Sequence, residues 1–138
     1  EANLANKLKT VQKLAAEGLP VGVILKPLIP FVNDTEANIG EIIAKAKQAG
    51  ARFIYPSFGI VLADDQRQAF MNLIARELPG LRNIFMDTFG LKKSWASPNQ
   101  KQLKKAFVFN VKKQKLPFGM SDIIAITKPA QEVQIKLF

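Results

Sequence analysis

The residues most clearly spaced for chemistry are five lysines of one predicted helix: Lys101, Lys104, Lys105, Lys112 and Lys115. At about 100° per residue, their side chains fall within an arc of roughly 100° around the helix axis. An ammonium group binds phosphate as a point charge, so this stripe predicts contact with a nucleic-acid backbone. Such binding is salt-sensitive and independent of base sequence. The alternative is an ordinary solvated helix face.

The distribution of charge points to the same segment. The chain has 138 residues and a formal net charge of +9. Residues 81–116 contain nine basic side chains and a single acidic one, Asp87, whereas residues 1–80 contain nine basic and eight acidic side chains. Residues 117–138 are balanced at two and two. Nearly all of the excess positive charge therefore lies in one segment, which we expect to form a polyanion-binding surface.

Cysteine and histidine are both absent from the sequence. Their absence excludes thiolate nucleophiles, disulfides, zinc fingers and iron–sulfur ligation by this polypeptide. A hydrolytic triad would also lack its usual base.

Two short apolar runs, at residues 21–28 and 51–58, predict β-strands that are covered on both faces and run parallel. Helical periodicity flanks both runs, which gives the order α-β-α-β-α. We expect Asn33 and Glu36 to form the capping box of the second helix and Asp64 or Asp65 to cap the third. The third helix is expected to bury Ala69, Phe70, Leu73, Ile74 and Leu78.

The remainder is predicted to be mostly helical. A short helix over residues 81–89 precedes a loop that contains Trp95, which lies close to the lysines in the sequence. Ser97 with Pro98 predicts the start of the basic helix, which runs to about Leu116. Beside its lysine stripe, Leu103, Phe107 and Val111 are expected to pack on the body of the protein. Ser121 is expected to cap a last short helix. The predicted division is residues 1–63 as βα units, 64–128 as a basic helical extension and 129–138 as a flexible tail. The fold class is α/β, and because two strands leave both edges open, we expect self-association or membership of a larger sheet.

Residues 27–34, Pro-Leu-Ile-Pro-Phe-Val-Asn-Asp, lie within a longer segment, 14–50, that resembles the fifth-strand region of radical S-adenosylmethionine enzymes. The resemblance is greatest to the spore-photoproduct-lyase-like branch, also described as DNA repair photolyase-like. Residues 50–59, Gly-Ala-Arg-Phe-Ile-Tyr-Pro-Ser-Phe-Gly, look like the sixth strand of that branch. Residues 79–126 are similar to its helical C-terminal extension.

The resemblance implies a fragment of a partial TIM-type (β/α)6 barrel in a lyase-like parent protein. In that family a 4Fe–4S cluster on a C-x-x-x-C-x-x-C loop cleaves S-adenosylmethionine. Because this chain has no cysteine and begins at Glu1 without a methionine, we expect the cluster-binding half to precede it. The chain alone is then expected to be inactive and to bind neither cofactor.

The resemblance also assigns cofactor contacts. Ile29 matches the aliphatic residue that touches the adenine, and Asp34 stands at the acidic position of the G-x-I-x-G-x-x-E pattern. Pro27 and Phe31 replace its two glycines. Backbone at the end of the sixth strand also meets the adenine, which adds Tyr55, Ser57 and Phe58. Alternatively, Ile29 and Phe58 are core residues and Asp34 only starts a helix.

The C-terminal residues Gln134, Ile135, Lys136, Leu137 and Phe138 resemble the Q-L-[SD]-L-F peptide that docks into the bacterial sliding clamp. In that peptide the glutamine offers hydrogen bonds while an aliphatic and an aromatic anchor fill an apolar pocket. Lys136 departs from the pattern. The alternative is an apolar tail that packs on the body of the protein.

Three functions remain open from the sequence. The chain is the C-terminal segment of a radical S-adenosylmethionine enzyme of DNA repair or nucleic-acid modification, a non-catalytic nucleic-acid-binding module with a clamp-binding tail, or a fragment of an unrelated βα-barrel enzyme. No apolar run is long enough for a membrane span, so we expect a cytoplasmic protein without a membrane partner.

Overall fold

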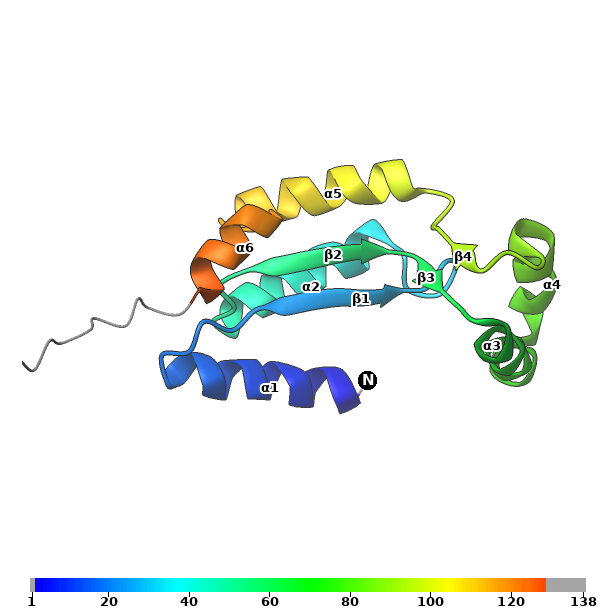
Figure 1. Ribbon diagram of the computed structural model, residues 1–138, viewed down its shortest axis with the longest axis horizontal. Helices are drawn as coiled ribbons and strands as arrows, with labels where there is room; N and C mark the ends of the chain where they lie inside the picture. The colour runs from blue at the N-terminus through cyan, green and yellow to red at the C-terminus, as the bar shows by residue number, and fades with distance from the viewer. Residues whose placement is uncertain (1, 129–138) are drawn as a thin grey trace, which may run out of the picture.

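A computed structural model describes residues 2–128, and in this range the chain has an α/β architecture (Figure 1). Six helices accompany two small sheets of two strands each. The elements in chain order are α1 (Ala2–Ala16), β1 (Val23–Leu28), α2 (Glu36–Gln48), β2 (Ile54–Phe58), β3 (Ile60–Val61), α3 (Asp64–Glu77), α4 (Pro79–Phe89), β4 (Ser94–Trp95), α5 (Gln100–Lys113) and α6 (Met120–Thr127).

The first sheet consists of β1 and β2, which pair in parallel. Val23 aligns with Ile54 and Leu28 aligns with Phe58, with an irregularity in the register between Leu25 and Leu28. The prediction of two parallel strands joined by a helix is therefore confirmed. Both strands end at the same edge, so the loops that follow them are brought together there.

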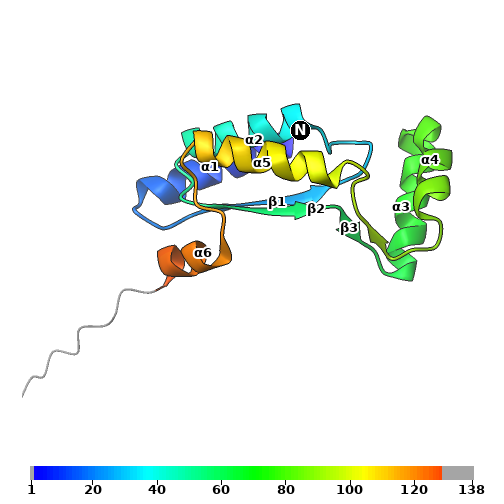
Figure 2. The ribbon, with the colours of Figure 1, turned by 90° about the horizontal axis from the view of Figure 1, so that it is seen from above.

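Helices α1, α2 and α5 lie on one side of this sheet (Figure 2). Beneath them is the larger core, in which Leu25 and Ile54 of the strands are at most 5% exposed. Its other fully buried members include Ile39, Ile43, Leu103, Phe107 and Val111. Burial of each large aliphatic side chain contributes about 1.5–3 kcal/mol, so α5 belongs to this core as firmly as α2 does.

The other face of the sheet is largely open. Among the elements of residues 2–128, only α6 lies on this side, near the beginning of the strands (Figure 2). Ile24 and Tyr55 are 64% and 38% exposed. The prediction that both strands are covered on both faces is wrong for the described part of the chain. Along the outer edge of β2, the Ile54 N–H donates to the carbonyl of Pro117 at 3.0 Å.

A smaller core holds α3 and α4 together beyond the ends of β1 and β2. Its buried members are Met71, Ile74, Phe85, Phe89 and Trp95. Strands β3 and β4, which the sequence analysis did not predict, pair antiparallel through Ile60 with Trp95 and Val61 with Ser94. This short ladder joins the smaller core to the larger one.

The prediction for the buried face of α3 is confirmed in part. Ile74 is buried and Phe70 is half-buried, as predicted, and Met71 is buried as well. The other three predicted residues, Ala69, Leu73 and Leu78, are exposed. The apolar stripe of α3 is wide, and its partner α4 covers only one side of it. Leu73 remains 44% exposed as a result.

The predicted helix caps are also corrected. Thr35, not Asn33, is the N-cap of α2, where its hydroxyl accepts from the Asn38 N–H at 3.1 Å. Ala63 is the N-cap of α3, and the Gln66 side chain accepts from its N–H at 3.1 Å.

At the two C-terminal helices the predicted serine caps are replaced as well. Asn99 is the N-cap of α5, and Ser97 is 3% exposed with no hydrogen-bond partner for its hydroxyl among the described residues. Gly119 is the N-cap of α6, two residues before the position expected from Ser121. At α5, the tertiary structure buries Ser97 and the N-cap position is taken by Asn99, although serine is a strongly preferred N-cap residue.

Between residues 2 and 128, no helix has both the length and the apolar content that crossing a bilayer requires.

Gly59 is required where β2 passes into β3. Its φ is +107°, and a Cβ atom there would lie 2.3 Å from the carbonyl oxygen of Trp95. We predict that Gly59→Ala lowers the free energy of unfolding by at least about 2 kcal/mol, because strain and a backbone clash add. Urea unfolding followed by circular dichroism measures this loss.

Gly80 provides the matched control for that substitution. A Cβ at Gly80 would meet nothing within 4 Å, so Gly80→Ala within α4 is expected to keep stability within about 1 kcal/mol or raise it. Equal effects of the two substitutions would contradict the close approach of Gly59 to β4.

Candidate functional site

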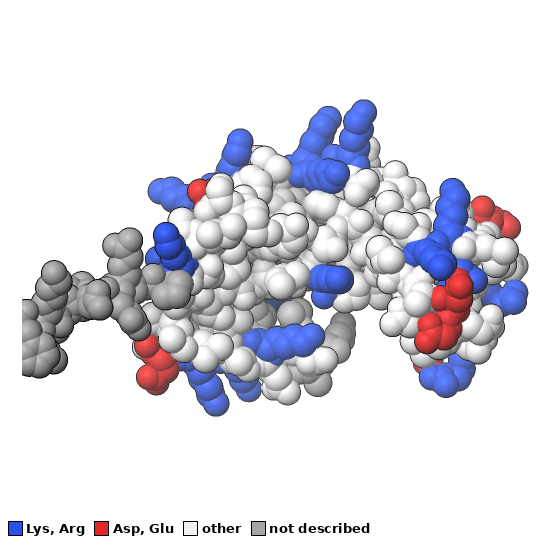
Figure 3. All heavy atoms as spheres, viewed as in Figure 1, with Lys and Arg blue, Asp and Glu red and all other residues white. Residues whose placement is uncertain are grey.

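The lysines predicted to bind phosphate share an exposed surface. Lys101, Lys104, Lys105 and Lys112 lie on α5, and all four are exposed. Lys115 is also exposed, but it follows the end of α5 and has a φ of +55°. We call these five residues the α5 lysine surface. In the space-filling view, basic side chains project along the edge of the molecule that α5 forms (Figure 3).

Helix α5 presents these lysines because its other side is anchored. Leu103, Phe107 and Val111 recur with helical spacing and are at most 2% exposed. The ring of Phe107 also meets Phe58 and Phe118 edge to face, at centroid distances of 6.0 Å and 5.7 Å. The helix is therefore fixed in rotation, and the predicted interior stripe is confirmed.

No carboxylate of residues 2–128 forms an ion pair with the α5 lysine surface. The ion pairs of this range are Lys45–Glu41, Arg67–Asp64, Arg76–Glu77 and Lys93–Asp64. The electrostatic repulsion among the α5 lysines is therefore screened by solvent alone unless an anion binds there.

One exposed aromatic side chain on α5 was not among the predicted site residues. Phe109 is 67% exposed and lies one helical turn from both Lys105 and Lys112. Trp95, the aromatic residue noted near the lysines in the sequence, is only 1% exposed and packs in the smaller core, so it is not part of the α5 lysine surface. The signal was present in the sequence, because Phe109 does not fit the 103–107–111 spacing of the buried stripe.

A second candidate region is an apolar cleft of about 830 Å³ at the carboxyl ends of β1 and β2. Three of the five predicted cofactor residues, Ile29, Ser57 and Phe58, line it together. The opposite wall is formed by α3, through Phe70 and Leu73. This cleft explains why the outward stripe of α3 is apolar although it is not buried.

Ile29 and Phe58 also pack on the protein interior, Phe58 against the larger core and Ile29 against the smaller one. The cleft polar groups are few and come from Lys26, Ser57, Gln66 and Ser94. A concave, mostly apolar lining with a few polar groups is typical of small-molecule sites.

The other two predicted cofactor residues lie outside the cleft lining. Tyr55 is on the open face of the sheet. The Asp34 carboxylate accepts from the N–H of Phe31 at 2.8 Å, within the loop after β1. The neighbouring Asn33 side chain accepts from the Ile29 N–H at 2.6 Å and donates to the Pro27 carbonyl at 3.1 Å. Both polar side chains therefore hold the loop that positions Ile29.

Phe31 connects this loop to α4. Its ring lies 5.5 Å from Phe85, edge to face, and 6.2 Å from Phe89. Its φ is +63°, in the left-handed region that favours glycine. The position is one of the two where the radical S-adenosylmethionine pattern has glycine.

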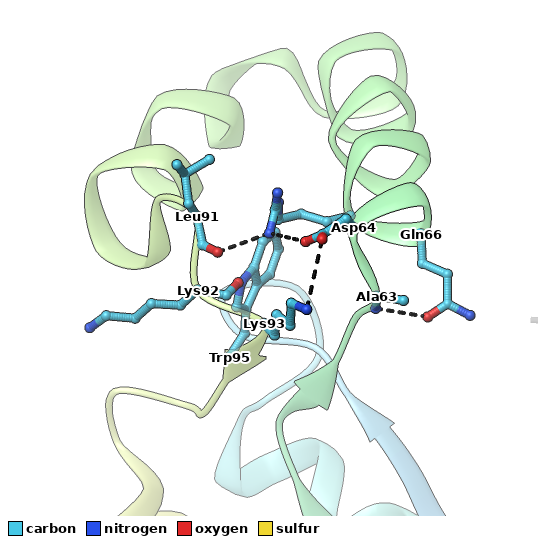
Figure 4. A network of polar contacts seen from close by, with 8 residues as sticks. Ala63, Asp64, Gln66, Leu91, Lys92, Lys93 and Trp95 are labelled. Carbon is cyan, nitrogen blue, oxygen red and sulfur yellow. Dashed lines mark hydrogen bonds and ion pairs between the residues drawn. The ribbon is translucent and has the colours of Figure 1, made fainter.

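Polar contacts fix the start of α3 against the segment after α4 (Figure 4). Arg67 donates to Asp64 at 3.0 Å and to the Leu91 carbonyl at 2.8 Å, and Lys93 lies 3.7 Å from the same carboxylate. The indole N–H of Trp95 donates to the Lys92 carbonyl at 2.7 Å. These contacts hold the α3 wall of the cleft in place.

Residues 2–128 contain no group of three or more acidic side chains that could hold a metal ion. A 4Fe–4S cluster does not fit this chain, which has no cysteine to ligate it. The predicted clamp-binding residues Gln134, Ile135, Leu137 and Phe138 lie outside the described residues.

Comparison of the chain with models of known protein families, with curated proteins and with solved structures gave no match. The function is therefore inferred from the geometry and the charge of the two candidate regions.

We predict that Phe31→Gly is more stable than Phe31→Ala by about 0.5–1 kcal/mol. Both variants lose the ring contacts with Phe85 and Phe89. The left-handed backbone conformation costs residues other than glycine about 1–2 kcal/mol, and only the glycine variant is free of this strain. Thermal unfolding of the two variants measures the difference.

Val32 is the control in the same loop, since its φ is not positive. There the usual order, with Val32→Ala more stable than Val32→Gly, is expected. If alanine were also the more stable substitution at Phe31, the left-handed conformation would be contradicted.

Proposed function

We propose that this protein binds nucleic acid through the α5 lysine surface, by contacts with backbone phosphates. The observation that carries this proposal is the exposure of five lysines on and just after one anchored helix, with no ion-pair partner among residues 2–128. A rigid row of ammonium groups releases condensed counterions from a polyanion, and this release is the main source of non-specific affinity.

The anchoring of α5 adds to this support. Because Leu103, Phe107 and Val111 fix the rotation of the helix, the lysine Cα atoms are held in place before any ligand arrives. Only the lysine side chains then lose conformational freedom on binding. The contacts would be independent of base sequence, since lysines on phosphates position a nucleic acid without reading it.

The lysines are tested with a quadruple variant, K101Q/K104Q/K105Q/K112Q. We predict that it weakens oligonucleotide binding by at least tenfold at low salt and lowers the slope of log K against log salt by about three to four. Fluorescence anisotropy with a labelled oligonucleotide at several salt concentrations measures both quantities.

A matched control removes the same charge elsewhere. Lys7, Lys9, Lys13 and Lys47 are exposed on α1 and α2, so K7Q/K9Q/K13Q/K47Q changes the net charge equally. It is expected to reduce affinity far less. Equal losses would mean that only the overall charge matters, and no binding of the unmodified chain at low salt would refute the proposal.

A second candidate function is favoured by the cleft. We propose that the chain forms the last βα units of a larger partial barrel, in a radical S-adenosylmethionine enzyme that acts on nucleic acid. Its support is that Ile29, Ser57 and Phe58 line one apolar cleft at the carboxyl ends of parallel strands, where barrel enzymes bind their ligands. The open sheet face, with Ile24 and Tyr55, would be covered by the preceding strands.

In that protein Ile29 and Phe58 would pack on the adenine, and Asn33 and Asp34 would hold the loop that carries Ile29. The cysteines of the preceding half would hold the iron–sulfur cluster, which would supply the electron for the reductive cleavage of S-adenosylmethionine. The α5 lysine surface would hold the nucleic acid on the same polypeptide.

For this candidate we predict a C-x-x-x-C-x-x-C segment in the reading frame that precedes the Glu1 codon. In the longer protein, Ile29→Asp is expected to weaken S-adenosylmethionine binding at least tenfold, because a carboxylate would be buried against an apolar ring. Equilibrium dialysis measures the affinity. Leu91→Asp, at a residue that is 79% exposed and outside the cleft, is the control. A reading frame without the cysteines would refute this candidate.

A further inference from the structure

Phe109 is the most exposed aromatic side chain of residues 2–128. It is 67% exposed, compared with 38% for Tyr55 and 36% for Phe31. Single exposed apolar residues are common on protein surfaces and need no explanation. Phe109 differs from them because it lies between lysines of the α5 lysine surface and beside two surface hollows.

Two shallow hollows flank the Phe109 ring. One has a volume of about 460 Å³ and is lined by Lys104, Lys105, Val108, Phe109 and Lys112. The other, of about 560 Å³, lies toward α2 and is lined by residues that include Gly40, Glu36 and Glu41. Phe109 therefore borders open space on two sides and is mostly exposed, so a planar group can approach it.

The second hollow is lined by a glycine, Gly40, at the point where α2 faces α5. A Cβ on Gly40 would lie 3.2 Å from the Asn110 side chain, so α2 and α5 approach closely at this point. A larger side chain there would press on the Asn110 side chain, which also lines this hollow.

The charges around the ring are unequal. The first hollow is lined by Lys104, Lys105 and Lys112 and by no carboxylate. The second hollow is lined by Glu36 and Glu41 and shares Lys105 with the first. A phosphate is therefore attracted more strongly to the first side than to the second. A bound strand would thus place its phosphates over Lys104, Lys105 and Lys112 and direct a base toward Phe109.

The spacing along the helix suits one nucleotide. At a rise of about 1.5 Å per residue, Lys105 and Lys112 lie about 6 Å and about 4.5 Å from Phe109 along the axis of α5. Both ammonium groups can reach the phosphates on either side of a base that is stacked on the ring.

We infer that the nucleic acid bound by the α5 lysine surface is single-stranded, with an unpaired base stacked on Phe109. This inference rests on the proposed phosphate binding. Inside a duplex the base faces are covered by neighbouring pairs, and a ring on the surface of a protein helix cannot reach them. Only the end pairs have an open face. Stacking on an exposed aromatic ring is a recurring feature of single-strand binding and tolerates every base.

The test uses Phe109→Trp as a reporter in the full chain. Trp95 is the only tryptophan of the sequence and is 1% exposed, so quenching on titration with oligonucleotide would come from the new indole. We expect quenching by single-stranded oligothymidylate. We expect almost none from a long duplex, in which the two end pairs are a small fraction of the binding sites, at concentrations where anisotropy detects its binding.

Affinity gives the second readout. Phe109→Ala is expected to weaken single-strand binding at least fivefold and to leave duplex binding unchanged. Leu91→Ala, at an apolar residue that is 79% exposed outside the lysine surface, is expected to change neither.

The outcomes separate the two proposals. If single strand and duplex bind with the same affinity and Phe109→Ala affects neither, the stacking inference is overturned and phosphate binding stands. If neither binds at low salt, phosphate binding is overturned together with the inference that rests on it.

Discussion

The packing of Trp95 is the constraint on which the rest of the structure depends. Its backbone pairs with Ile60 in the β3–β4 ladder, and Gly59 allows the two segments to approach. Its ring stacks on Phe89 at 5.0 Å and also meets Phe70 and Phe85. One residue thus joins the smaller core to the end of the sheet, and aromatic pairs of this kind add about 0.5–1.5 kcal/mol each beyond the area that they bury.

Two surfaces follow from that junction. Because β4 and α3 are held beyond the ends of β1 and β2, an apolar cleft is left between α3 and the strands. Helix α5 follows β4 after a short connection, so the position of β4 fixes where the helix begins. From there α5 packs on the larger core and its lysines face outward. The cleft and the lysine surface are therefore positioned by the same short segment, which includes the buried Ser97.

Local patterns allowed much of this fold to be predicted. The parallel strands and the buried stripe of α5 were predicted correctly because apolar periodicity is a local signal. The caps were not, since Asn33 is used to hold the loop after β1 and Ser97 is buried. Strands β3 and β4 have only two residues each, which is too short for a periodic pattern. Trp95 was placed in a loop because nothing local indicates its aromatic partners.

The sequence by itself determined the chemistry that this chain can offer: a concentrated excess of lysine, no thiolate or imidazole, and two strand-length apolar runs. Only the tertiary structure decided that Ile29, Ser57 and Phe58 share a cleft while Asp34 does not, and that Phe109 rather than Trp95 is exposed beside the lysines. The physical reason is that composition and periodicity are properties of neighbours along the chain. Exposure depends on which distant segments pack against a side chain, and no local pattern contains that information.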